Sequence, residues 1–210
     1  MLFRSQEPRA IMSREILEKL AEMMANIAKA YNEMGATIIS MDEPTLALLV
    51  GKRKTLFHNE DTIIEILNKA IKPIEKYSSI HICGRIAPKL CDILLSSNVK
   101  IMDHEFVNGS NEGVFEKRMF EREDKTLAYG AIQSSVPFQK EGSLETYVET
   151  EAVMVARLQK AVNEFGAENI ILKPDCGFGG LLASFGPELA PEIVRRKLKM
   201  LSTAMKIVRS

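Results

Sequence analysis

Four side chains along the sequence are of the types that hold a catalytic zinc ion. His81 and Cys83 form an H-x-C pair, Glu105 ends a D-H-E motif, and Cys176 lies in a D-C-G motif. Zinc binds imidazole, thiolate and carboxylate groups, and most protein sites give it four ligands. A zinc ion can also hold a substrate thiol as a thiolate, which is the nucleophilic form. The motifs therefore indicate a zinc-dependent transfer of an alkyl group to a thiol.

The composition is that of an ordinary globular protein. The 210 residues suit one domain, and the 28 basic and 28 acidic side chains balance, which argues against electrostatic binding to nucleic acid or anionic lipid. No apolar run reaches the roughly 18 residues of a membrane span, and the N-terminus lacks the apolar core of a signal peptide. Three cysteines, an odd number, argue against a disulfide framework. We expect a cytoplasmic protein that binds neither nucleic acid nor membrane.

Helical and strand patterns alternate along the chain. Apolar residues at helical spacing predict helices over residues 13–34, 62–76 with a break near Pro73, 87–96, 114–121, 144–165 and 187–208. Short apolar and β-branched runs predict strands over residues 36–41, 79–82, 99–103, 127–132 and 170–172. Five strands, each preceded by a helix, imply a parallel sheet with helical crossovers.

The candidate ligands lie at or just past the carboxyl ends of the predicted strands. This edge carries the active site in α/β barrels and in open α/β sheets. Residues two apart on a strand share a face, so His81 and Cys83 can point the same way, as can Asp103 and Glu105. If the strands curve into a barrel, we expect these faces to converge at its mouth.

Packing in the core is the alternative explanation for each residue taken singly. A lone cysteine such as Cys176 is more often a buried apolar residue than a ligand. Cys91 has helical spacing with several leucines and is expected in the core. His58 lies in a polar loop and is expected in solvent, as is the charged run 52–54. His104 alternates out of phase with Glu105, so we expect it to face the helical layer or solvent. The combination of ligand types at successive strand ends favours the zinc interpretation.

The motifs resemble those of the C-terminal catalytic domain of cobalamin-independent methionine synthase. The matching segments are residues 38–44, which end in D-E-P, and the motifs H-I-C at 81–83, D-H-E at 103–105 and K-P-D-C-G at 173–177. The family belongs to the zinc methyltransferase barrels related to uroporphyrinogen decarboxylase. The resemblance implies a TIM (βα)8-type barrel, incomplete at the N-terminus with about five βα units, as a single catalytic domain over residues 1–210.

The resemblance also assigns roles to individual residues. It implies that His81, Cys83, Glu105 and Cys176 bind Zn2+, and that Asp42 of the D-E-P motif binds the amino group of homocysteine. The activity implied is methyl transfer to the homocysteine thiol, which gives methionine. Glu105 is a hard ligand beside two soft thiolates, so we expect it to yield its place to the substrate sulfur.

The methyl donor and the completeness of the enzyme remain open. The family carries a histidine near residues 130–137 that assists protonation of the folate leaving group, and this chain has none there. A methyl-corrinoid, which can be protein-bound, is therefore favoured over methyltetrahydrofolate. The alternatives are a methylcobamide:thiol methyltransferase of the coenzyme M type and a non-catalytic zinc-binding subunit of a split enzyme. A full barrel takes about 250 residues, so a homo-oligomer or a partner subunit is expected to complete it.

Overall fold

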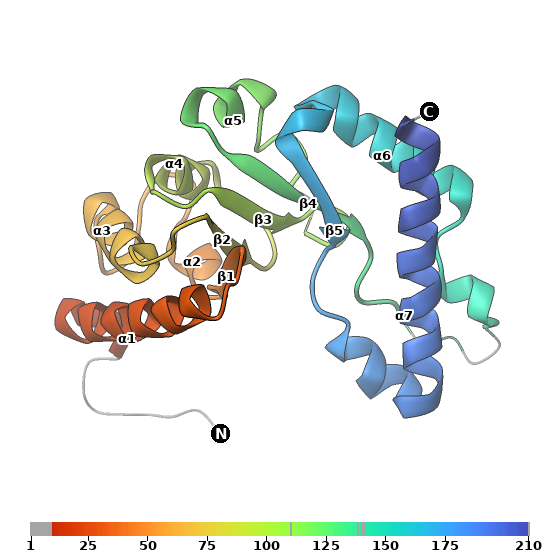
Figure 1. The fold of residues 1–210 in the computed structure, drawn as a ribbon, viewed down its shortest axis with the longest axis horizontal. Coiled ribbons are helices and arrows are strands. Elements are labelled where there is room, and N and C mark those ends of the chain that lie inside the picture. The colour runs from red at the N-terminus through yellow and green to blue at the C-terminus, as the bar shows by residue number, and fades with distance from the viewer. Residues whose placement is uncertain (1–9, 110, 138, 140–141, 210) are drawn as a thin grey trace. The chain divides into compact units, whose positions relative to one another are not determined.

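The computed structural model describes residues 10–109, 111–137, 139 and 142–209, and it has an α/β fold (Figure 1). Its five-stranded sheet has the order β1-β2-β3-β4-β5, and β1 pairs with β2, and β4 with β5, in parallel. The strands are β1 (Ile38–Asp42), β2 (Tyr77–Ile82), β3 (Ile101–Glu105), β4 (Thr126–Ile132) and β5 (Ile170–Pro174). The predicted α/β class and parallel sheet are confirmed, whereas closure into a barrel stays a prediction.

The chain forms two compact units, and the first contains residues up to Ile82 together with Ile86–Met102 and Arg122–Lys125. Its helices are α1 (Arg14–Glu33), α2 (Leu46–Leu49), α3 (Glu60–Ile71) and α4 (Pro88–Ser96), preceded by the 3-10 turn η1 (Ala10–Met12). Ser13 and Asn59 cap α1 and α3 by accepting hydrogen bonds from backbone N–H groups of the first turns. The helix predicted over residues 62–76 with a break near Pro73 ends at Ile71, because Pro73 has no backbone N–H with which to continue the helical hydrogen bonds. The short α2 was not predicted.

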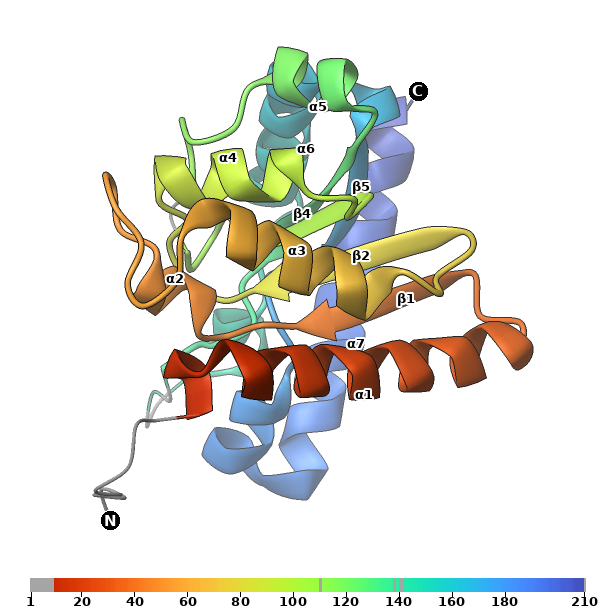
Figure 2. The same ribbon diagram turned by 90° about the vertical axis from the view of Figure 1, so that its left-hand side faces the viewer.

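One face of α1 presents an apolar stripe to solvent. Helix α1 packs against α3 in this unit (Figure 2), and two ion pairs, Arg14–Glu65 and Lys69–Glu22, join them at 2.7 Å. The remaining apolar side chains of the helix are spaced three or four residues apart and are 40–80% exposed. This α1 stripe consists of Ile16, Leu20, Met23, Ile27, Tyr31 and Met34.

The second unit contains Cys83–Arg85, Asp103–Glu121 and the chain from Thr126 onward. Its helices are α5 (Lys117–Glu123), α6 (Glu151–Phe165) and α7 (Gly179–Arg209), with 3-10 turns η2 (Leu144–Tyr147) and η3 (Ala167–Asn169). Its core contains an aromatic cluster in which neighbouring rings lie 4.2–6.2 Å apart between centroids. The cluster consists of Phe106, Phe115, Phe120, Tyr129 and Phe165.

Helix α5 begins and ends later than the helix predicted over residues 114–121, and two further predicted helices of this unit also differ from the structure. The helix predicted over residues 144–165 is η2 followed by α6, because Val148 is extended and the Thr150 hydroxyl caps a new helix at the N–H of Val153. The closing helix begins earlier than predicted, at Gly179, and it is interrupted at Gly186, which has φ 72°. Pro187 then restarts the helix, a position that suits its fixed φ. Among the described residues, no helix is long and apolar enough to cross a membrane.

Candidate metal centre

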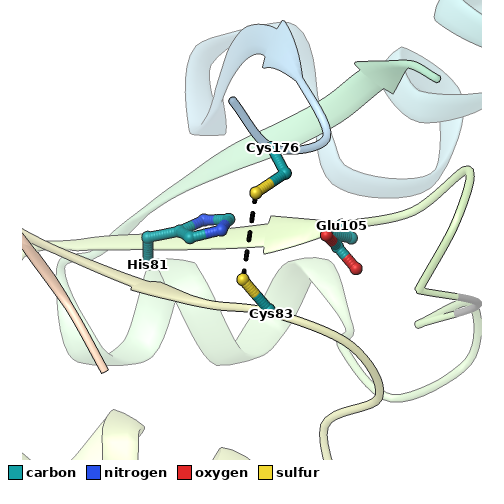
Figure 3. Close-up of side chains that lie close together, drawn as sticks. All are labelled: His81, Cys83, Glu105 and Cys176. Carbon is teal, nitrogen blue, oxygen red and sulfur yellow. Dashed lines mark hydrogen bonds between the residues drawn. The ribbon is translucent and has the colours of Figure 1, made fainter. Parts of the chain in front are cut away.

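The four predicted ligands form one cluster at the carboxyl ends of the strands (Figure 3). One ligand atom from each of His81, Cys83, Glu105 and Cys176 lies within 4.8 Å of the others. The two sulfur atoms point toward each other at 3.9 Å, and in this view His81 and Glu105 lie on either side of the pair. Taken as whole residues, all four are half-buried, so the cluster is shielded but reachable from solvent.

The geometry of the cluster fits a tetrahedral zinc ion. Two sulfurs bound at about 2.3 Å and at the tetrahedral angle lie about 3.8 Å apart, close to the 3.9 Å between Cys83 Sγ and Cys176 Sγ. A disulfide would require about 2.05 Å, and none of the three cysteines, all of which lie in the described residues, is in one. The widest spacing exceeds a tetrahedral edge by about 1 Å, which small torsional changes at the side chains can close. Two thiols, an imidazole and a carboxylate are a ligand set that suits zinc.

Asp42 lies at the last position of β1, next to His81 of β2. The parallel register pairs Asp42 directly with His81, so both side chains leave the sheet on the same face. The carboxylate of Asp42 is exposed, and the N–H of the following Glu43 donates to the carbonyl of His81 at 2.9 Å. The predicted substrate anchor therefore stands at the same sheet edge as the candidate ligand His81.

Asp175, the first residue of the D-C-G motif, organises the loop that follows Glu105. Its side chain is fully buried and accepts backbone N–H hydrogen bonds from Phe106 (2.9 Å), Val107 (3.1 Å) and Asn108. Burial raises the pKa of the Asp175 carboxyl, while the three N–H donors act in the opposite direction. One carboxylate thus ties the segment that carries Cys176 to the loop after Glu105. The sequence contained this residue in a motif but did not indicate its role.

The half-buried Lys173 links β3, β5 and the loop that follows β5. Lys173 Nζ lies 2.6 Å from Asp103 Oδ1 and donates to the carbonyl of Asp175 at 2.7 Å. Strand β4 separates β3 from β5, and Gly130 is the β4 residue in register with Lys173, so no side chain obstructs the lysine. Lys173 thereby balances the charge of Asp103 and supports the backbone immediately before Cys176.

Gly130 is required by the close approach of Asp175. A Cβ atom at this position would lie 2.2 Å from Asp175 Oδ1 and 2.9 Å from the carbonyl oxygen of His104. We expect Gly130→Ala to destabilise the protein by about 2 kcal/mol or more, because backbone on both sides would have to move. Thermal or urea unfolding measures this loss.

Gly180→Ala is the matched control for this prediction. No atom lies within 4 Å of the corresponding Cβ, and the residue lies in the first turn of α7, where alanine favours helix. The control is expected to be neutral or slightly stabilising. Equal stability of the two variants would contradict the tight contact between Gly130 and Asp175.

The other cysteine and the other histidines do not join the cluster. Cys91 is buried in α4 among leucines, as predicted, and burial raises the pKa of its thiol to about 12. His104 is fully buried and stacks on Phe115 with ring centroids 5.3 Å apart, so it faces the packed layer rather than solvent. The prediction that His58 lies in solvent was wrong. The residue is half-buried, and its Nε2 lies 2.8 Å from the carbonyl oxygen of Ile11. The run 52–54 is exposed, as predicted.

Two proteins of similar sequence carry the name methionine synthase. The one from Methanocaldococcus jannaschii is 24% identical over 174 residues, which are 82% of this chain and 49% of that protein. The one from Pyrococcus abyssi is 26% identical over 193 residues, which are 90% of this chain and 48% of that protein. The chain is similar to methionine synthases. This similarity confirms the resemblance that the motifs indicated. The methionine-synthase-like chain spans about half the length of the curated relatives it matches. No family model matches the chain.

The fold is similar to that of solved methionine synthases. A B12-independent methionine synthase from Shewanella sp. W3-18-1, solved in complex with selenomethionine, superimposes with a TM-score of 0.67 at 21% identity over 99% of this chain and 56% of that one. A Listeria monocytogenes protein assigned as a vitamin-B12 independent methionine synthase gives 0.59 at 17% identity, over 93% and 57%. These likenesses concern the fold, and they agree with the α/β architecture of the methionine-synthase-like chain.

Proposed function

We propose that the methionine-synthase-like chain is a zinc-dependent methyltransferase that transfers a methyl group to the thiol of homocysteine, giving methionine. The observation that carries this proposal is the cluster of His81, Cys83, Glu105 and Cys176 within 4.8 Å at the strand ends. The names of the two sequence relatives support methyl transfer to homocysteine as the reaction. Two of the three cysteines are candidate metal ligands, a use of cysteine that suits a reducing compartment, so we also propose a cytoplasmic location.

The four side chains would divide the work of holding zinc and admitting substrate. Zinc bound there would lower the pKa of a substrate thiol, so that the nucleophilic thiolate forms near neutral pH. His81, Cys83 and Cys176 would be the firm ligands, because imidazole and thiolate bind zinc strongly. Glu105 would be the exchangeable one, since a hard carboxylate competes poorly with a soft sulfur. The cluster is half-buried, so a small thiol can reach it from solvent.

Asp42 would orient the substrate through its ammonium group. The carboxylate is exposed and stands level with His81, so an amino acid whose sulfur lies at the cluster can present its ammonium group to the end of β1. A charge-assisted hydrogen bond of this kind is short and directional. Holding the ammonium fixes the direction of the sulfur and lowers the entropic cost of methyl transfer.

We favour a methyl-corrinoid, free or protein-bound, as the methyl donor. The loop after β4 contains Gln133 and Ser134 but no histidine, and the N–H of Gln133 donates to the buried carboxylate of Glu149 at 2.8 Å. A folate leaving group needs a proton, and none of the described side chains of this loop is an acid that could give one near neutral pH. Cobalt(I) leaves without a proton. Methyltetrahydrofolate is the competing donor.

Two measurements test the proposal. X-ray absorption at the zinc edge should show two sulfur ligands, and a third after homocysteine is added. Methylcobalamin and methyltetrahydrofolate are then compared as donors in a methionine-forming assay. Absence of zinc, or zinc whose sulfur coordination homocysteine leaves unchanged, would refute the methyltransferase. Zinc binding with no transfer from either donor would favour the non-catalytic subunit of a split enzyme, and transfer only to coenzyme M would favour the other thiol methyltransferase.

Replacing Asp42 is expected to weaken homocysteine binding selectively. Asp42→Asn removes the charge from a charge-assisted hydrogen bond worth about 1.5–3 kcal/mol, so KM for homocysteine should rise roughly 10- to 100-fold. The affinity for zinc should not change, because Asp42 is not in the cluster. Asp61→Asn, an exposed aspartate in the first turn of α3, is the control. An unchanged KM in Asp42→Asn would remove this residue from the substrate site.

We also propose that the α1 stripe is covered by a second copy of the chain or by a partner subunit that supplies further βα units. An apolar helix face with side chains 40–80% exposed is stabilised when another apolar surface removes it from water. If a second copy covers the stripe, light scattering should give a mass above the 23.5 kDa of one chain. If a partner subunit covers it, the chain alone should be a monomer whose mass increases only when that subunit is added.

If two copies associate through the α1 stripe, Leu20→Lys is expected to lower the mass measured by light scattering toward that of one chain. A lysine at this position places a charge in the middle of the α1 stripe and disfavours its burial. Glu18→Lys, an exposed change on the same helix outside the stripe, should leave the mass unchanged. A wild-type protein that is a stable monomer and is fully active alone would contradict the need for any partner.

A further inference from the structure

The side chain of Asn111 connects the two chain segments that carry Cys83 and Glu105. Asn111 is fully buried, and its amide nitrogen donates to the carbonyl oxygen of Gly84 at 2.9 Å and to that of Glu105 at 2.7 Å. A side-chain amide nitrogen has two N–H donors, so each of these carbonyls can take one. Gly84 directly follows Cys83 in the chain. Both acceptors are therefore backbone groups at or beside a candidate zinc ligand.

A second hydrogen bond joins the same two segments through the carboxylate itself. The N–H of Gly84 donates to Oε2 of Glu105 at 2.9 Å. Gly84 has φ +78°, a conformation that side chains other than glycine rarely adopt, so this N–H is aimed by the backbone. A carboxylate that accepts this bond through one oxygen keeps the other oxygen available to a metal ion. The arrangement therefore favours Glu105 as a ligand through a single oxygen.

Gly109, in the chain after Glu105, lies tightly against these groups. A Cβ atom on Gly109 would lie 2.7 Å from Glu105 Cβ and 2.9 Å from the carbonyl oxygen of Gly84. Only a glycine allows the backbone at position 109 to lie this close to the Glu105 side chain and the Gly84 carbonyl. Residues 106–108 thus hold Asp175 through their backbone N–H groups, and the side chain of Asn111 holds the Cys83 and Glu105 segments.

We propose that Asn111 is a positioning residue for the metal site. Its amide fixes the spacing of the Cys83 and Glu105 segments, and so keeps the Gly84 N–H on one oxygen of Glu105. That hydrogen bond shares the charge of the carboxylate, which weakens Glu105 as a ligand and makes it the one that a substrate thiol replaces. The inference rests on the proposed zinc function, and Asn111 lies outside every motif that indicated that function.

The test compares zinc affinity in Asn111→Ala with that of the wild-type protein. Residues that hydrogen-bond to metal ligands typically change metal affinity 10- to 100-fold, and we expect a loss in that range, measured by competition with a chromogenic chelator. Cobalt(II) in place of zinc reports ligand geometry, and its visible absorption should shift in the variant. Asn111→Ser keeps one hydroxyl donor and should lie between the two. If Asn111→Ala does not fold, zinc affinity is compared between Asn111→Ser and the wild-type protein instead.

Asn169→Ala is the matched control. Asn169 also donates its side-chain amide to a backbone carbonyl, that of Phe165 at 2.9 Å, in the same unit but away from the cluster. It should lower thermal stability to a similar degree and leave zinc affinity unchanged. Zinc affinity in Asn111→Ala within twofold of the wild type would overturn the inference. A wild-type protein that binds no zinc would instead contradict the proposed function itself.

Discussion

Replacing Cys176 with serine should lower the zinc affinity of the chain by more than about 100-fold, beyond the range typical of residues that only support a ligand. The Sγ of Cys176 lies 3.9 Å from that of Cys83, the spacing of two thiolates on one zinc ion. A hydroxyl does not ionise near neutral pH and is a hard donor, so it cannot replace the thiolate. Methyl transfer should fall with the metal. Zinc content after dialysis and chelator competition measure the effect.

Cys91→Ala is the control for the Cys176 prediction. Cys91 lies in the core of α4, and burial raises the pKa of its thiol to about 12, so it is a poor metal ligand and a poor nucleophile. Its variant should lose some stability but bind one zinc as before. Thiol labelling adds a second measurement, because zinc should protect Cys83 and Cys176 while Cys91 stays unreactive in both states. If Cys176→Ser keeps its zinc and its activity, the ligand assignment is wrong.

Replacing Asp175 with alanine should cost about 3 kcal/mol or more of unfolding free energy. The change leaves the N–H groups of Phe106, Val107 and Asn108 without their acceptor, and an unsatisfied buried donor costs about 1–3 kcal/mol. The loop after Glu105 would loosen, so zinc affinity should also fall. Urea unfolding of the metal-free protein measures the first effect and chelator competition the second.

Asp175→Asn tests how many of these three hydrogen bonds contribute to stability. Phe106 and Val107 donate to Oδ1 and Asn108 to Oδ2, so an amide can keep the first two bonds and loses the third. Its loss of stability should therefore be smaller than that of Asp175→Ala. The exposed Asp92 offers a control, since Asp92→Ala should change stability by less than about 0.5 kcal/mol. Equal stability of Asp175→Ala and the wild type would show that the loop does not depend on this carboxylate.

Much of the fold could be predicted because the local patterns agree with the final structure. The apolar spacing and the Ser13 cap predicted α1 to within one residue, and all five predicted strands are present. The misses lie where a local signal competes with the pattern. The Thr150 cap splits the helix predicted over residues 144–165, and Gly186 interrupts the closing helix. A side-chain cap and a single positive φ are weak signals within a long apolar repeat.

The sequence predicted which four residues come together in the candidate site, but not the residues that support them. Side chains able to bind zinc are chemically unusual, and their placement at strand ends made convergence physically reasonable. Asp175, Lys173 and Asn111 are ordinary polar residues whose partners lie 67–69, 70 and up to 27 positions away in the chain. No local spacing indicates such partners, because the sheet brings them together. The same limit applies to His58, whose partner Ile11 is 47 positions away.

The sequence by itself determined the chemistry that is available: two thiols, an imidazole and a carboxylate at the ends of strands, with Asp42 one strand away. It did so because residue type sets which ions a side chain can bind, and the alternation of helix and strand sets which edge of the sheet it occupies. Only the tertiary structure decided the spacing of these groups and what holds them. Hydrogen bonds from Asp175 and Asn111 depend on distances across the fold, and those distances are set by packing between residues far apart in the chain.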